Sequence, residues 1–203
     1  MFKSKKILNL LMILYLLCVG VSLYFCAKAM FTVKILPARV VMYGLLVAAL
    51  VLALFYGLRG GRKRDHRFYK SFCILYLIAD GGCLFNAMLL LANFRNPPFL
   101  LVAALVSFLC VTTITVGKNL NPGGALTVCA LNVAITPVAT ACSELLANSE
   151  VRLPPDMTIP PELMFSLFSL SLVLLIATMF KFNDKAVRAA KKREFIPGGT
   201  KKC

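Results

Sequence analysis

The residue with the greatest chemical potential in the sequence is Asp80, a carboxylic acid in a long apolar stretch. It is the only charged residue between Lys70 and Arg95. A charge in a stretch that crosses a membrane is costly, so such residues usually face a protein interior or a wet cavity. We therefore expect Asp80 to be a carboxylate linked to a proton or cation, or a contact to a ligand. The alternative is a protonated Asp80 that only ties two helices together.

A second pattern runs through residues 124–148. Polar side chains recur there at steps of three, four, four and three, and they are Cys129, Asn132, Thr136, Thr140 and Ser143. This spacing places all of them on one face of a helix. Pro137 removes a backbone donor in the same segment and frees the carbonyl of Val133. We expect Pro137 to break the helix that carries the polar face.

Helical geometry brings three of these polar groups to a similar depth. At about 1.5 Å per residue, Asp80, Ser107 and Asn132 each lie roughly 12–15 Å from the cytoplasmic side of the membrane. This depth is counted from the start of the segment for Asp80 and Asn132 and from its end for Ser107. A polar cluster beside a broken helix resembles the way transporters build binding sites, whereas ordinary packing between membrane helices uses the same small polar residues. The predicted substrate-binding set is Asp80, Asn86, Ser107, Asn132, Thr136 and Thr140.

The composition indicates which elements must hold these groups. Of the 203 residues, 60% are hydrophobic, and the mean hydropathy is +0.83. The charged residues are bunched, so long uncharged runs remain between them. Such runs indicate membrane spans, and the composition excludes a soluble enzyme, a disordered chain and a disulfide-stapled secreted domain.

Six apolar segments are long enough to cross a bilayer, which takes about 20 helical residues. They cover residues 7–27, 40–58, 71–94, 99–117, 124–148 and 163–180. The links between them carry glycine and proline, and no alternation of polarity indicates barrel strands. The sequence predicts an all-α, polytopic membrane protein with one helical domain over residues 1–180 and a basic tail over residues 181–203.

The distribution of Lys and Arg predicts the orientation. With both termini in the cytoplasm, eighteen of these residues lie in inner segments and five in outer ones, as the positive-inside rule requires. We therefore expect six spans in the plasma membrane, with N-in and C-in termini. The alternative is a cleaved secretory signal over residues 1–29 and five spans, but the first apolar run is longer than a signal core.

The net charge of +15 follows this topology, because the basic residues lie beside the spans. We expect them to attract anionic lipids of the inner leaflet, and we expect no nucleic-acid partner. In the tail, Lys181, Lys185, Arg188 and Lys192 repeat at helical spacing. The last span is therefore predicted to continue as a basic helix along the leaflet, with docking of an acidic partner as the alternative.

His66 and Cys73 form the one plausible pair of base and nucleophile at one side of the membrane. Seven residues separate them, so a continuous helix carries both side chains on one face. The run from Gly60 to Cys73, with a glycine pair ahead of His66, resembles the AgrB family of membrane peptidases that process quorum-sensing propeptides. The resemblance implies Cys73 as the nucleophile and His66 as the base. A solvated basic loop is the alternative.

Three functions remain open at this point. The leading prediction is a transport-type protein, either a substrate-binding subunit or a compact carrier. The second is an accessory subunit in which the polar face of residues 124–148, the polar stripe, packs against a partner membrane protein or a second copy of the chain. The third is the cysteine peptidase, so an enzyme is the less favoured reading. No nucleotide loop, zinc spacing or Ser-His-Asp order occurs, and we expect no metal or cofactor.

Overall fold

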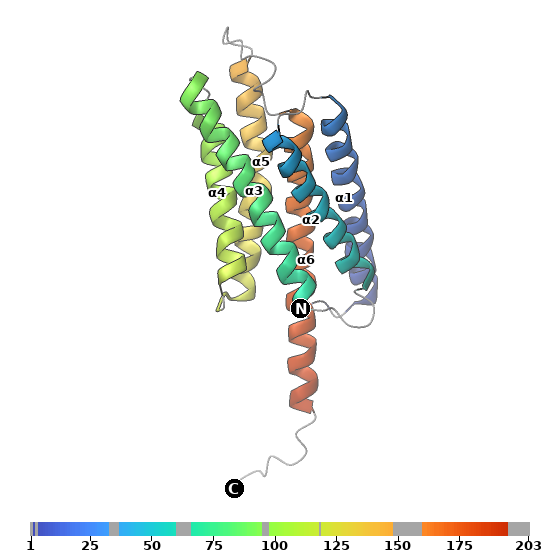
Figure 1. Ribbon diagram of the computed structural model, residues 1–203. Coiled ribbons are helices and arrows are strands. Elements are labelled where there is room, and N and C mark those ends of the chain that lie inside the picture. Colours follow the sequence, from blue (N-terminus) through green and yellow to red (C-terminus); the bar gives the residue numbers. More distant parts are fainter. Residues whose placement is uncertain are drawn as a thin grey trace.

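The computed structural model describes residues 2, 4–32, 37–59, 66–94, 98–117, 119–147 and 160–194 (Figure 1). Within these residues every regular element is a helix: α1 (Lys5–Thr32), α2 (Pro37–Arg59), α3 (His66–Phe94), α4 (Pro98–Val116), α5 (Pro122–Ala147) and α6 (Pro161–Glu194). Each helix coincides with one predicted apolar segment. The all-α prediction is therefore confirmed.

Prolines mark where most of the helices begin. The first residues of α2, α4, α5 and α6 are Pro37, Pro98, Pro122 and Pro161. Proline suits this position because its fixed φ matches a helix, and because the N–H that it lacks would have no intrahelical partner there. The breaks between the apolar segments of the sequence thus also start the next helix.

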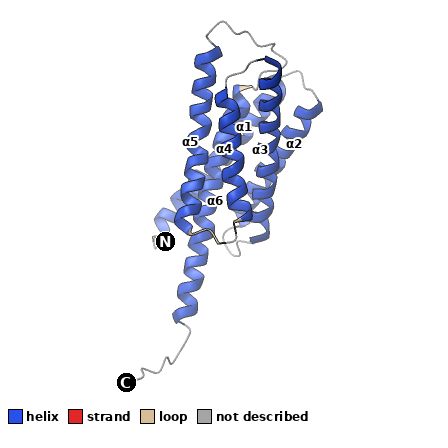
Figure 2. Ribbon diagram, turned by 90° about the vertical axis from the view of Figure 1, so that its left-hand side faces the viewer, coloured by secondary structure: helices blue, strands red, loops and turns tan. Residues whose placement is uncertain are grey.

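The six helices form a closed ring in chain order. Each helix contacts the next one along the chain, and α6 returns to contact α1. Figures 1 and 2 show them side by side, with consecutive helices running in opposite directions. Helix α6 also touches α2 and α3 across the ring, and it is the most buried of the long apolar helices. It is therefore the central helix of the bundle.

One end of the bundle gathers basic side chains. Helices α1 and α3 begin there, α2 ends there, and α6 leaves the ring there, as Figure 1 shows. Its described cations are Lys5, Lys6, Arg59, Arg67, Lys70 and Lys181. We call this the basic end.

The outside of the bundle is apolar. Large exposed side chains on it include Leu10, Ile13, Leu17, Tyr24, Val41, Phe55, Ile78 and Leu109. Patches of this extent suit lipid rather than water. Five helices, α1, α2, α3, α5 and α6, are long and apolar enough to cross a membrane, and the described apolar part of α4, Leu101–Val116, is shorter. These features indicate a membrane-embedded protein.

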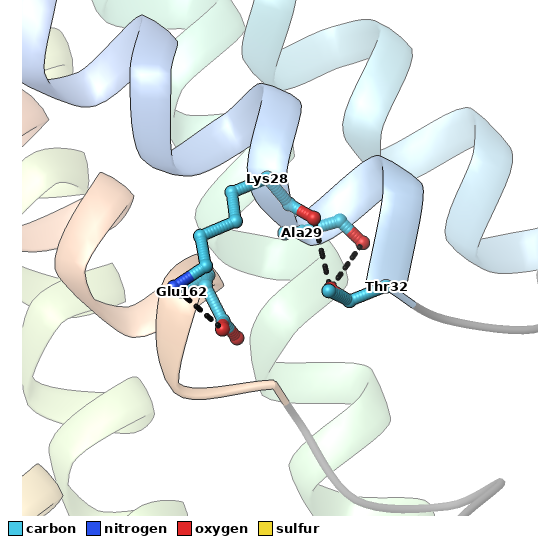
Figure 3. Close-up of polar contacts among 4 residues, drawn as sticks. All are labelled: Lys28, Ala29, Thr32 and Glu162. Carbon is cyan, nitrogen blue, oxygen red and sulfur yellow. Dashed lines mark hydrogen bonds and ion pairs between the residues drawn. The ribbon is translucent and has the colours of Figure 1, made fainter.

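Contacts at both ends of α1 close the ring against α6. Near the basic end, the backbone N–H of Phe2 donates to Oδ1 of Asn183 at 2.8 Å. At the other end, Lys28 Nζ lies 3.6 Å from Glu162 Oε1, and Figure 3 shows this ion pair beside Thr32 at the last turn of α1. The Thr32 hydroxyl caps that turn by donating to the Lys28 carbonyl at 2.8 Å. The N- and C-terminal helices therefore meet along the length of α1.

Helices α1 and α2 approach each other closely at Gly57. The Tyr15 hydroxyl of α1 donates to the carbonyl of Ala53, and the ring of Tyr15 lies against Gly57. A Cβ atom at residue 57 would lie 2.5 Å from Cε1 of that ring. The absence of a side chain at Gly57 is thus what admits the Tyr15 ring.

Two helices differ from expectation. The break expected at Pro137 is not found, since α5 is helical on both sides of the proline. A single missing N–H is tolerated because the turns before and after it keep their hydrogen bonds and neighbouring helices hold them. Helix α6 continues past Phe180 to Glu194, as the spacing of the basic residues predicts, but Figure 1 shows this extension in line with the span rather than turned to one side along a leaflet.

Candidate functional site

Asp80 lies at the middle of α3 and lines a small space that we call the Asp80 cavity. Its volume is about 30 Å³, and its other lining residues are Cys83, Ala103, Ala104, Ser107, Thr136, Met164 and Leu167. The carboxyl is buried, and its Oδ2 has no hydrogen-bond donor within the described part of the chain. Ser107 is a hydrogen-bond partner of the carboxyl. A space of this size holds about one water molecule, so it suits a water or a proton.

Tyr76, one turn from Asp80 on α3, joins three helices. The Ser171 hydroxyl of α6 donates to the Leu167 carbonyl at 2.9 Å, so the Tyr76 hydroxyl donates to Ser171, at 2.6 Å. Asn132 of α5 donates through Nδ2 to both hydroxyl oxygens, at 3.2 and 3.3 Å. Tyr76 also has Ser107 of α4 as a partner. These contacts link Asn132 to the edge of the Asp80 cavity.

A second polar group lies nearer the basic end. The Thr178 hydroxyl of α6 donates to the Leu174 carbonyl and accepts from the Tyr69 hydroxyl of α3 at 2.9 Å. Cys129 Sγ of α5 is 3.4 Å from the same Thr178 oxygen. From Cys129 to Asn132 is one turn of α5, a rise of about 4.5 Å. The two groups therefore form an interrupted polar column, whose members are Tyr69, Thr178, Cys129, Asn132, Tyr76, Ser171, Ser107 and Asp80.

The column begins at a much larger pocket at the basic end. This basic-end pocket has a volume of about 760 Å³, and Tyr69 belongs both to its lining and to the column. Its lining comes from α2 to α6: Tyr56, His66, Tyr69, Lys70, Cys73, Ile114, Thr115, Val116, Gly117, Leu120, Ala125, Lys181, Phe182, Asp184, Lys185 and Arg188. Small-molecule sites commonly have volumes of about 300–1,000 Å³, so this pocket is large enough for a solute.

Gly117 shapes the wall of the pocket at the end of α4. Its N–H donates to the Thr113 carbonyl at 2.8 Å, which completes the last turn of the helix. A Cβ atom here would collide with that carbonyl and with the Leu120 side chain. The chain can therefore fold back towards α5 at this level only with glycine.

The two residues of the predicted peptidase pair both line the basic-end pocket. His66 is exposed at the first turn of α3, whereas Cys73 is buried and has Tyr69 as a hydrogen-bond partner. Seven residues along a helix span about 10 Å, whereas a nucleophile and its base must come within about 3 Å. The helix thus places the pair in one pocket but on different levels.

The structure brings together most of the predicted substrate-binding set. Asp80, Ser107 and Thr136 line one cavity, and Asn132 joins them through Tyr76. Asn86 is half-buried on α3 and does not line the cavity. The side chains of Thr140 and Ser143, which complete the predicted stripe, lie outside the described residues.

Sequence reasoning missed four members of the column: Tyr69, Tyr76, Ser171 and Thr178. A signal was present, because Tyr69, Tyr76 and Asp80 follow each other at steps of seven and four, and Ser171 and Thr178 at a step of seven. These steps place each set on one helical face. Tyrosine and serine are common in apolar helices, so only the contact between α3 and α6 reveals that the two faces meet.

The described residues contain no group of three or more His, Cys, Asp or Glu side chains that could hold a metal ion. The candidate sites that their geometry offers are the Asp80 cavity and the basic-end pocket, linked by the polar column. No family model, curated protein or solved structure matches this chain.

Proposed function

We propose that this chain is a transport-type membrane protein with six spans in the plasma membrane and both termini in the cytoplasm. In this proposal the basic end faces the cytoplasm, as the positive-inside rule requires. A solute enters the basic-end pocket, and Asp80 gains and loses a proton as the protein changes conformation. The chain acts either as a compact carrier or as a substrate-binding subunit.

The observation that carries the proposal is the Asp80 carboxyl at the end of a buried polar column, one of whose oxygens has no donor among the described residues. Asp80 Oδ2 and Asn132 Oδ1 are both buried without a donor within the described residues, which costs about 1–3 kcal/mol for each group. A helix bundle that needed only packing would gain by replacing such groups with apolar ones. Ionisable residues within membrane spans mark ion and proton pathways, and this position supports that role for Asp80.

The volumes assign different tasks to the two spaces. The Asp80 cavity, at about 30 Å³, suits a proton or a water molecule, so the substrate cannot bind there in this conformation. The basic-end pocket, at about 760 Å³, suits the solute. In this proposal the residues around Asp80 therefore carry the proton, and the basic-end pocket holds the solute.

The alternative of an accessory subunit receives no specific support from the polar stripe of α5. Cys129, Asn132 and Thr136 are all buried inside the bundle, so a partner protein would have to use another surface. The peptidase alternative would require the side chains of His66 and Cys73 to approach each other across two helical turns.

Native cysteines provide the test, because they lie at successive depths. Cys73 lines the basic-end pocket, Cys129 belongs to the column and Cys83 lines the Asp80 cavity. Cys18 of α1 is a matched control, since it is 4% exposed against 5% for Cys83 but lies outside the column. Variants that retain one of these cysteines each are treated with a membrane-impermeant thiol reagent from each side of oriented vesicles.

A pathway that opens to water as the protein changes conformation predicts labelling from the basic-end side in the order Cys73, Cys129, Cys83, with Cys18 unreactive. Arg59→Cys and Ala38→Cys, at opposite ends of α2, report which side the reagent has reached. If these controls react but Cys129 and Cys83 react no faster than Cys18, the column does not open to water and the transport proposal fails.

A further inference from the structure

The basic-end pocket concentrates cations from two helices. Lys181, Lys185 and Arg188 follow each other on α6 at steps of four and three, so they share one helical face, and all three line the pocket. Lys70 lines it from α3. Asp184 is the single carboxylate among the lining residues. The pocket therefore carries a net excess of three positive charges, without counting His66.

One of these cations is held in place within the pocket. Lys181 Nζ lies 4.4 Å from the centre of the Tyr69 ring and 5.8 Å from that of the Phe182 ring. A lysine that served only to mark the cytoplasmic side would extend into solvent. Instead the ammonium group of Lys181 is half-buried over Tyr69, the residue that connects the pocket to the polar column.

The remaining walls are apolar or aromatic. Tyr56 and Phe182 contribute rings, and Ile114, Leu120 and Ala125 contribute aliphatic surface. A ligand that fits this lining has a compact group of high negative charge and an apolar body. Phosphate meets the first requirement best, because lysine binds it as a point charge and arginine can bind two of its oxygens at once.

We propose that the basic-end pocket binds an organic phosphate, with the phosphate between Lys70, Lys181, Lys185 and Arg188 and the apolar body against Tyr56 and Phe182. This inference names the solute class for the pocket and so rests on the proposed function. Two sources share the chemistry: a soluble phosphate ester and the headgroup of an anionic phospholipid. Basic pockets between membrane helices bind such headgroups.

Matched substitutions on α6 separate the pocket from general attraction by positive charge. Lys185→Gln with Arg188→Gln removes two cations that line the pocket. Lys191→Gln with Lys192→Gln removes two exposed cations from the same helix that do not line it. Both pairs change the net charge equally, and all four side chains are exposed, so both variants should fold.

Binding is measured by calorimetry on the purified full chain in an uncharged detergent. The probes are inorganic phosphate, phenyl phosphate and a short-chain phosphatidic acid. We expect the Lys185/Arg188 pair to weaken binding of the organic phosphates at least tenfold and the Lys191/Lys192 pair to change it less than twofold. Inorganic phosphate should bind more weakly than either ester, since it lacks the apolar body.

Equal weakening by the two pairs would show general charge attraction and overturn the proposal, as would failure of both esters to bind. Binding of the phosphatidic acid alone identifies a lipid headgroup as the source, and comparable binding of phenyl phosphate identifies a soluble ester. Because this binding is measured at equilibrium, it is independent of the thiol labelling. Binding of a phosphate ester without labelling of Cys129 and Cys83 would support the phosphate site and contradict the proposed pathway along the column.

Discussion

The two spaces of this protein lie along one polar column but differ in almost every physical property. The basic-end pocket is about 760 Å³ in volume and is lined by four Lys or Arg side chains. The Asp80 cavity is about 30 Å³ and contains one carboxyl group among small and apolar side chains. The first can exchange its contents with water or headgroups, whereas the second can exchange little more than a proton.

The free-energy cost of burying polar groups is offset in different ways in the two spaces. At the basic end, the cost of concentrating like charges is reduced by solvent, by aromatic rings and by any anion that binds. At Asp80, the donor is the Ser107 hydroxyl of the neighbouring helix α4. The cavity should therefore be sensitive to small changes in shape and hydrogen bonding, and the pocket should tolerate them.

The substitution with the largest expected effect, Asp80→Asn, tests whether the two spaces have separate functions. Asp80→Asn keeps the size of the side chain but removes the exchangeable proton. We expect proton flux, measured with a trapped pH-sensitive dye in proteoliposomes, to fall to the level of empty vesicles. Phosphate-ester binding in the pocket should stay within twofold of the unsubstituted chain. Undiminished flux in a folded Asp80→Asn protein would remove Asp80 from the pathway.

The next effect comes from the same substitution made in both spaces. Ala103 lines the Asp80 cavity and Ala125 lines the basic-end pocket, and both are buried. Ala103→Leu overfills the cavity and should lower the free energy of unfolding by about 1–3 kcal/mol. Ala125→Leu has space to enter and should cost less than about 0.5 kcal/mol. Unfolding in mixed detergent micelles measures both, and equal costs would contradict the assigned difference in size.

A smaller effect is expected when two tyrosines lose their hydroxyl groups. Tyr76→Phe leaves Asn132 and Ser171 without a shared partner in the dry part of the column, at a cost of about 1–2 kcal/mol. Tyr69→Phe removes the bond to Thr178 beside the pocket, where water can replace it, at a cost of about 0.5 kcal/mol. The same unfolding measurement gives both values. A larger cost for Tyr69→Phe than for Tyr76→Phe would mean that the column is drier near the basic end than near Asp80, which contradicts the prediction.

The smallest effect should come from a charge pair outside both spaces. Glu162→Gln removes the ion pair with Lys28, whose side chain is 49% exposed. Exposed pairs contribute about 0–1 kcal/mol, so the free energy of unfolding should change by less than about 0.5 kcal/mol, and neither proton flux nor phosphate binding should change. An altered flux would mean that the far end of the bundle is coupled to the column.

Much of the fold could be predicted from the sequence because its signal is local. Apolar length and the prolines at 37, 98, 122 and 161 define the helices, and the uncharged surroundings of Asp80 single it out as a site residue. The depth of Ser107 and Asn132 follows from helical rise alone. These inferences need no knowledge of which helices touch.

The rest depended on contacts between distant segments. The column requires the faces of α3 and α6 that carry Tyr76 and Ser171 to meet, which follows only from closure of the ring. The pocket requires the face of α6 that carries Lys185 and Arg188 to lie beside α3 and the end of α4, which helical spacing alone does not show. The expected break at Pro137 was wrong for a related reason, since the neighbours of α5 hold the helix through a local defect.

The contact between α1 and α6 that closes the ring has a consequence for biosynthesis. Helix α1 leaves the ribosome before its main partner α6, to which it is joined by contacts such as those of Ser22 with Ser166 and of Phe2 with Asn183. Helices α1 to α5 are therefore made while the ring is still open, and Tyr76 and Asn132 lack their Ser171 partner until α6 joins them. Assembly of the polar interior should be a single late event, and truncation before α6 should yield a chain that quality-control proteases recognise.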